Sequence, residues 1–122
     1  MSAIFDSDRY SPKEIAERVE TIGVTKASLP LLSQVALGIL AGGFIGLGAL
    51  YFTLVVSDAS LALAAQRVLG GVAFSLGLIL VVVAGAELFT GNNLLVMAFV
   101  SRRISAAKLV QNFIVIYLAN LV

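Results

Sequence analysis

The stretch Glu87-Leu88-Phe89-Thr90-Gly91-Asn92-Asn93 carries the most information in this sequence, because it interrupts a long apolar run. Glu87 is the only formal charge between Arg67 and Arg102. Polar groups at membrane depth are costly unless they line a cavity or pack against protein. Many transporters use interrupted helices to aim backbone dipoles at a solute. The stretch predicts a membrane permeation device; the alternative is a kinked helix with satisfied caps and no transport role.

Composition indicates an all-α membrane protein. The 122 residues are 60% hydrophobic and 12% charged, with a mean hydropathy of +1.05, whereas a soluble domain carries about 25% charged residues. Residues 29–56 and 68–86 form two apolar runs. Each reaches about the 20 residues that a bilayer requires, so both are expected to span it.

Several function classes are disfavoured by what the sequence lacks. It contains no histidine and no cysteine, so the commonest metal ligand and the thiolate ligands are missing. A net charge of +1 gives no support for nucleic-acid binding. No catalytic constellation is evident. We expect neither an enzyme nor a bound metal or cofactor.

Residues 1–26 are predicted to be a cytoplasmic tail followed by an amphipathic helix at the membrane interface. Ser11-Pro12-Lys13-Glu14 predicts the helix start, with Ser11 as cap and Glu14 as its capping-box partner. Gly23 is expected to end the helix. Its apolar face can pack on the protein itself or lie flat on the membrane surface, and the two are compatible.

Residues 27–122 are predicted to be the transmembrane region. The second span breaks into a loop over 87–93 and continues as a half-helix over 94–101. A third apolar run, 109–122, is shorter than the roughly 20 residues of a full span. It is either re-entrant or the sequence stops inside a span, and we expect the latter. Basic residues gather on the cytoplasmic side of membranes, and their distribution here predicts a cytoplasmic N-terminus.

Glycines at helical spacing predict close helix packing in both long spans. Small residues four apart let a second helix approach. The first span contains Gly38, Gly42 and Gly46, and the second contains Gly70, Gly71 and Gly77.

The side chains of the break suggest separate roles. Gly91 permits a turn, and Asn92 or Asn93 can cap the following half-helix. The Thr90 hydroxyl can donate a hydrogen bond to an anion. Leu88 and Phe89 are bulky enough to form an apolar constriction.

Glu87 opposes an anion path if it faces one, because a carboxylate repels anionic cargo. We expect it to face a neighbouring helix or subunit instead, hydrogen-bonded or paired with a basic residue.

Longer motifs resemble the formate–nitrite transporter family. Phe74-Ser75-Leu76-Gly77-Leu78-Ile79-Leu80 and Gly85-Ala86 followed by the break are similar to the second helix of that family and its interruption. Supporting similarities are Gly23-Val24-Thr25-Lys26-Ala27, Ala41-Gly42-Gly43-Phe44-Ile45-Gly46, Gln111-Asn112 and Asn120-Leu121-Val122.

The resemblance implies an aquaporin-like helical bundle of six spans in two inverted repeats, assembled as a homopentamer in a bacterial or archaeal inner membrane. It implies transport of formate, nitrite, hydrosulfide or similar small anions, in some members with a proton, and no redox cofactor. The implied positions are Phe74 and Leu78 in the outer constriction, Leu88 and Phe89 in the inner one, Thr90 in the loop facing a central histidine, and Lys26 near the cytoplasmic end.

The pore histidine of that family belongs to the second repeat, and this sequence has none. We expect the sequence to be the N-terminal half of a protein about twice as long, most similar to formate members. Two alternatives remain: a half-length protein that needs a partner, and a structural membrane subunit without transport activity.

Overall fold

The computed structural model describes residues 10–122, so most of the predicted N-terminal tail, residues 1–9, lies outside the described residues. The described part is all-helical, as predicted, with no strand between residues 10 and 122. Its helices are α1 (Pro12–Ala27), α2 (Leu31–Val56), α3 (Leu63–Ala84), α4 (Phe89–Asn92), α5 (Leu95–Val100) and α6 (Ala106–Asn120).

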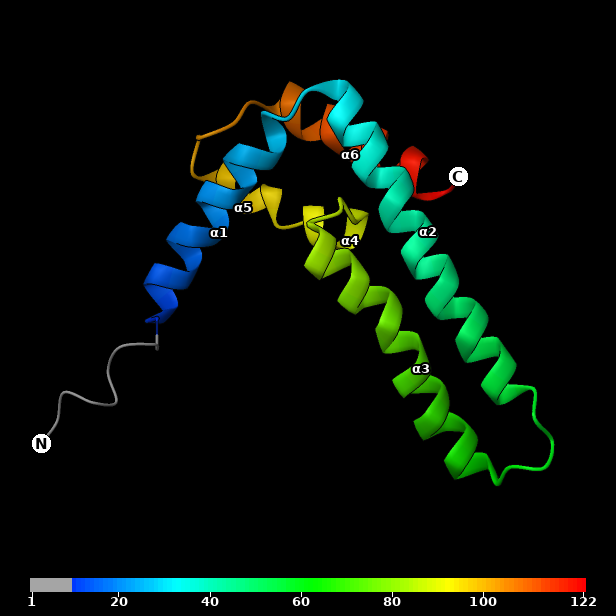
Figure 1. Cartoon of the computed structure of the whole chain (residues 1–122). Helices are drawn as coiled ribbons and strands as arrows, with labels where there is room; N and C mark the ends of the chain where they lie inside the picture. Colours follow the sequence, from blue (N-terminus) through cyan, green and yellow to red (C-terminus); the bar gives the residue numbers. More distant parts are fainter. Residues whose placement is uncertain (1–9) are drawn as a thin grey trace, which may run out of the picture.

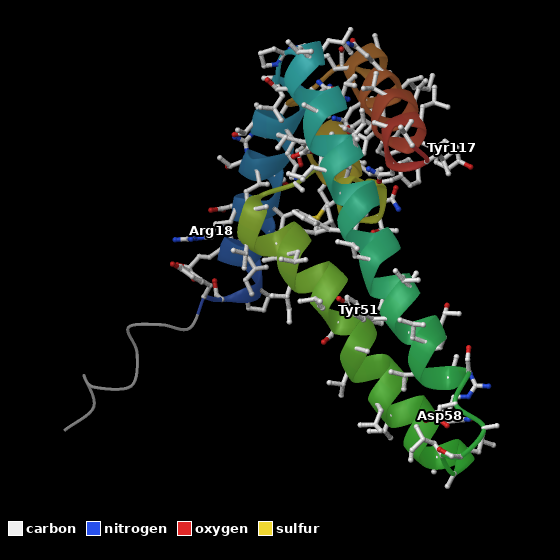
Figure 2. The ribbon with its side chains drawn as sticks, turned by 45° about the vertical axis from the view of Figure 1, so that its right-hand side comes forward. Arg18, Tyr51, Asp58 and Tyr117 are labelled. Carbon is white, nitrogen blue, oxygen red and sulfur yellow. The ribbon has the colours of Figure 1, made fainter. Side chains whose placement is uncertain are left out.

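Helices α2 and α3 form a long antiparallel hairpin. The remaining helices lie at the end of the hairpin away from the turn that joins α2 to α3 (Figure 1). There, α6 packs on α2 and α1 packs on α5. Figure 2 shows Asp58 at the tip of the hairpin and Tyr117, on α6, towards the opposite end. The interruption between α3 and α4 therefore lies where α1, α2 and α6 converge.

Both hairpin helices are long and apolar enough to cross a membrane. Their large apolar side chains are exposed, for example Leu54 at 61% and Val83 at 81%. A soluble protein rarely exposes a contiguous apolar surface of this extent. A helix that is apolar all round belongs in a core or in lipid, and α2 and α3 are mostly exposed among residues 10–122, as expected of helices that face lipid or other membrane helices. The chain is a membrane protein.

Glycine packing brings the long helices into direct backbone contact. A Cβ at Gly48 would lie 2.8 Å from the Phe74 carbonyl oxygen, and one at Gly77 would lie 2.7 Å from that of Phe44. The predicted close approach is confirmed for Gly38, Gly42, Gly70 and Gly77. Among residues 10–122 no close approach occurs at Gly46 and Gly71, where a Cβ would meet nothing within 4 Å.

Helix α1 begins as predicted and ends later than predicted. Ser11 caps it, and Glu14 completes the capping box, which holds the pKa of the Glu14 carboxyl below its ordinary value. Gly23 does not end the helix. It is buried against α5, where a Cβ would lie 3.1 Å from Cβ of Ala98. The helix continues for another turn and carries Lys26 to its C-terminal end.

Helix α3 ends at Gly85, whose φ of +63° lies in the left-handed region that favours glycine. The sequence predicts one loop over 87–93, but the short helix α4 occupies most of it. The predicted capping by Asn92 or Asn93 is wrong. The N-cap position of α5 is Leu94, without a side-chain hydrogen bond, and the Asn92 side chain has other partners, described below.

Candidate functional site

The backbone of the break is held by hydrogen bonds from two other helices. The Glu87 N–H donates to the Leu37 carbonyl on α2 at 3.2 Å. The Asn120 side chain, from the end of α6, accepts from the Phe89 N–H at 2.8 Å. Its amide nitrogen donates to the carbonyls of Glu87, at 2.9 Å, and Gly38, at 2.8 Å. Backbone groups freed at membrane depth need such partners, and Asn120 supplies them.

Asn120 can reach these groups because the α2–α6 contact is close. A Cβ at Gly38 would lie 2.6 Å from Cβ of Ala119, and one at Gly42 would lie 2.5 Å from the Asn120 carbonyl oxygen. The glycines on α2 are thereby linked to the geometry of the break, since a larger side chain at either position would move α6 away from it.

A buried polar network lies beside the break. Nζ of Lys26 donates to Oε1 of Glu87 at 2.9 Å and to Oδ1 of Asn92 at 3.0 Å. Nδ2 of Asn92 donates to Oε2 of Glu87 at 2.7 Å and to Oδ1 of Asn112 at 2.9 Å. The prediction that Glu87 pairs with a base on a neighbouring helix is confirmed, and the base is Lys26.

The two charges of this ion pair are unequally exposed. The Lys26 side chain is 26% exposed and that of Glu87 only 4%. The ammonium has three N–H donors, and Glu87 and Asn92 occupy two of them. Within residues 10–122 the ammonium therefore has one donor without a partner, and the lysine is the more exposed member of the pair.

An open groove of about 600 Å³ runs along the same region. Its wall is mostly apolar and consists of Ile22, Lys26, Leu78, Val81, Val82, Gly85, Ala86, Glu87, Leu88, Thr90 and Gly91. Apolar side chains from α3 and the break thus adjoin three polar residues, Thr90 and the ion-paired Lys26 and Glu87.

The groove gathers six of the ten residues that the sequence nominates: Lys26, Leu78, Glu87, Leu88, Thr90 and Gly91. Phe74 lies one helical turn before Leu78, so the two share a face of α3. Asn92 is fully buried in the network behind the groove, and Asn93 is exposed but does not line it.

Phe89 lies apart from Leu88 in this structure. Its ring packs edge-on against Phe113, at 5.6 Å between ring centroids, and against Tyr117, at 5.4 Å. The structure therefore brings Leu88 and Leu78 to one groove and turns Phe89 towards α6.

Sequence reasoning did not assign functional positions to Asn112 and Asn120. The available signal was a polar amide within an apolar helix, which is expensive in a membrane and therefore marks a specific contact. Within residues 10–122 no group of three or more His, Cys, Asp or Glu side chains is placed to hold a metal ion.

The sequence model of the formate/nitrite transporter family matches residues 13–122. The chain belongs to this family. It is 43% identical over 113 residues to the uncharacterized transporter YrhG of Bacillus subtilis, covering 91% of this chain and 42% of that protein. It is 39% identical over 116 residues to the formate channel FocA of Escherichia coli K12, covering 94% of this chain and 41% of that protein.

A third relative in the formate/nitrite transporter family is the formate channel BtFdhC of Bacillus thuringiensis, at 40% identity over 119 residues, 93% of this chain and 44% of that protein. The chain thus spans about two fifths of the length of these relatives. They are transporters and channels rather than enzymes. No solved structure matches the chain significantly.

Proposed function

We propose that this chain is the N-terminal part of a membrane channel or transporter for small monovalent anions, formate first, and that the anion path follows the groove. The observation that carries the proposal is the ion pair at the groove wall, whose lysine side chain is partly exposed, at 26%, while its carboxylate is buried. Membership of the formate/nitrite transporter family and relatives named formate channels support formate as the first substrate to test.

Electrostatics favours a monovalent anion in such a groove. A bare anion between apolar walls loses its hydration, which costs several kcal/mol or more. A unit positive charge 4 Å away returns about 4 kcal/mol at an effective dielectric constant of 20. Glu87 also lines the groove and cancels part of this attraction, but its side chain is only 4% exposed and its two carboxylate oxygens accept hydrogen bonds from Lys26 and Asn92. Lys26 and the Thr90 hydroxyl then offset the desolvation.

The proposal extends to the whole protein by analogy with the family. The whole protein would be an aquaporin-like bundle of two inverted repeats that assembles as a homopentamer. It would lie in the inner membrane with its N-terminus in the cytoplasm. Phe74 and Leu78 form the outer constriction, and Leu88 forms the inner one, since Phe89 packs against α6 outside the groove. Gly91 completes the polar centre, with Asn92 buried behind it and Asn93 outside the groove. The anion passes either alone or together with a proton. Nitrite and hydrosulfide are the alternative substrates.

The Thr90 hydroxyl provides the direct test. Replacing Thr90 with valine keeps the shape and removes the hydrogen-bond donor, so we expect formate uptake into proteoliposomes to fall about 3- to 10-fold, the equivalent of one hydrogen bond of roughly 0.5–1.5 kcal/mol. Thr90→Ser is the matched control, because it keeps a hydroxyl, and uptake should stay near the parent rate.

Unchanged uptake, with an unchanged pH dependence, in Thr90→Val would remove Thr90 from the path. Competition between formate and nitrite in the same vesicles ranks the two substrates. A structural subunit without transport activity predicts no formate entry into vesicles that contain the protein as its host makes it.

A further inference from the structure

Asn112 lies in the middle of α6 and outside the groove, yet it belongs to the polar network. It is 1% exposed, and its Oδ1 accepts a hydrogen bond from Nδ2 of Asn92 at 2.9 Å. It makes no contact with Lys26 in this network, so any effect on the ammonium must pass through the Asn92 amide.

The orientations of the two amides are determined by their neighbours. Oδ1 of Asn92 faces the Lys26 ammonium, and its Nδ2 faces the Glu87 carboxylate. A rotated Asn92 amide would place N–H donors against an ammonium and an oxygen against a carboxylate. A rotated Asn112 amide would set two NH₂ groups against each other. Each amide therefore has one favourable orientation.

The two polar atoms of the Asn112 side chain differ in their hydrogen bonding. Its Nδ2 is buried and has no hydrogen-bond partner within residues 10–122. An unpaired amide nitrogen in a buried site destabilises the protein, and an apolar residue of similar size would avoid the cost. The Oδ1 atom, which binds Asn92, is the part of the side chain that the network uses.

We propose that Asn112 is a positioning residue for the anion path. Its Oδ1 holds Asn92, and Asn92 in turn holds the Lys26 ammonium at the groove wall. The inference rests on the proposed function, because its consequence is the affinity of the groove for an anion. Asn112 sets the place of the positive charge and touches no solute itself.

Two substitutions of nearly equal shape test the role of this oxygen. Asn112→Thr keeps an oxygen that can accept from Asn92, and Asn112→Val does not. For formate uptake by the protein as its host makes it, we expect Val to raise the apparent KM about 3- to 10-fold, the equivalent of one buried hydrogen bond. The maximal rate should stay within about twofold. Thr should recover part of the KM increase, since its hydroxyl keeps an acceptor facing Asn92, although one bond shorter than Oδ1.

A second background shows whether the effect passes through Lys26. In Lys26→Met with Glu87→Gln the ammonium is absent, so adding Asn112→Val should leave KM unchanged. Equal KM values for Asn112→Thr and Asn112→Val would overturn the inference. The same rise in KM when Asn112→Val is added to the variant without the ammonium would also overturn it.

Asn112→Leu is the second apolar variant. Failure of both Val and Leu to give folded protein, while Thr folds, would make Asn112 a folding residue and would also overturn the inference. Absence of formate uptake in the unsubstituted protein would instead reject the proposed function, which keeps the two failures distinct.

Discussion

Replacing Lys26 with methionine should destabilise the protein by about 3–5 kcal/mol, the cost of removing one partner of a buried ion pair. Glu87 is 3% exposed and would be left with a carboxylate that has lost its countercharge. Asn92 would remain as a donor to Oε2 only. The free energy of unfolding in mixed detergent micelles measures the loss.

Because Glu87 is more deeply buried than Lys26, we expect the two single substitutions to lower the free energy of unfolding by different amounts. Glu87→Gln should cost less than Lys26→Met, because the flexible lysine stem can move its ammonium into the groove. The double variant should recover part of the loss, since neither charge then lacks its partner. Equal losses for the two single variants, or a double variant as unstable as their sum, would contradict this description of the pair.

Replacing Gly77 with alanine should separate the two long helices and destabilise the protein by about 1–3 kcal/mol, the usual cost of overpacking. The added Cβ would lie 2.7 Å from the Phe44 carbonyl oxygen and 3.3 Å from Cα of Gly48. Both contacts are backbone atoms, so relief requires a helix to move. Unfolding in mixed detergent micelles again measures the effect.

Gly71 on the same helix is the matched control. A Cβ there would meet nothing within 4 Å, and alanine is the better helix former by roughly 1 kcal/mol. Gly71→Ala should therefore be neutral or slightly stabilising. Comparable losses at Gly71 and Gly77 would show that α2 and α3 are held together by something other than this glycine contact.

Local features of the fold were predictable from the sequence because their causes are local. Ser11 and Glu14 lie within one turn, so the capping box can be recognised from their spacing. The break after Ala86 is marked by polar residues in an apolar run. The need of Glu87 for a cation follows from the cost of a buried carboxylate, which pointed to a pair before its partner could be named.

The remainder of the site depends on contacts between residues far apart in the chain. Lys26 and Glu87 are 61 positions apart, and Asn120 reaches the break only through the close α2–α6 contact at Gly38. No short motif contains that information. Gly23 shows the same limit, since a glycine near a helix end indicates a C-cap until its packing against Ala98 is known.

The central claim, that the groove beside the break conducts a small anion, is tested most directly by two neighbouring valines on α3. Val82 lines the groove and Val83 does not, although both are exposed, at 70% and 81%. Formate uptake should fall about tenfold or more in Val82→Trp, because a bulky ring narrows the path. It should stay near the parent rate in Val83→Trp at equal protein content. Equal uptake by the two variants, or a larger loss for Val83→Trp, would contradict the claim.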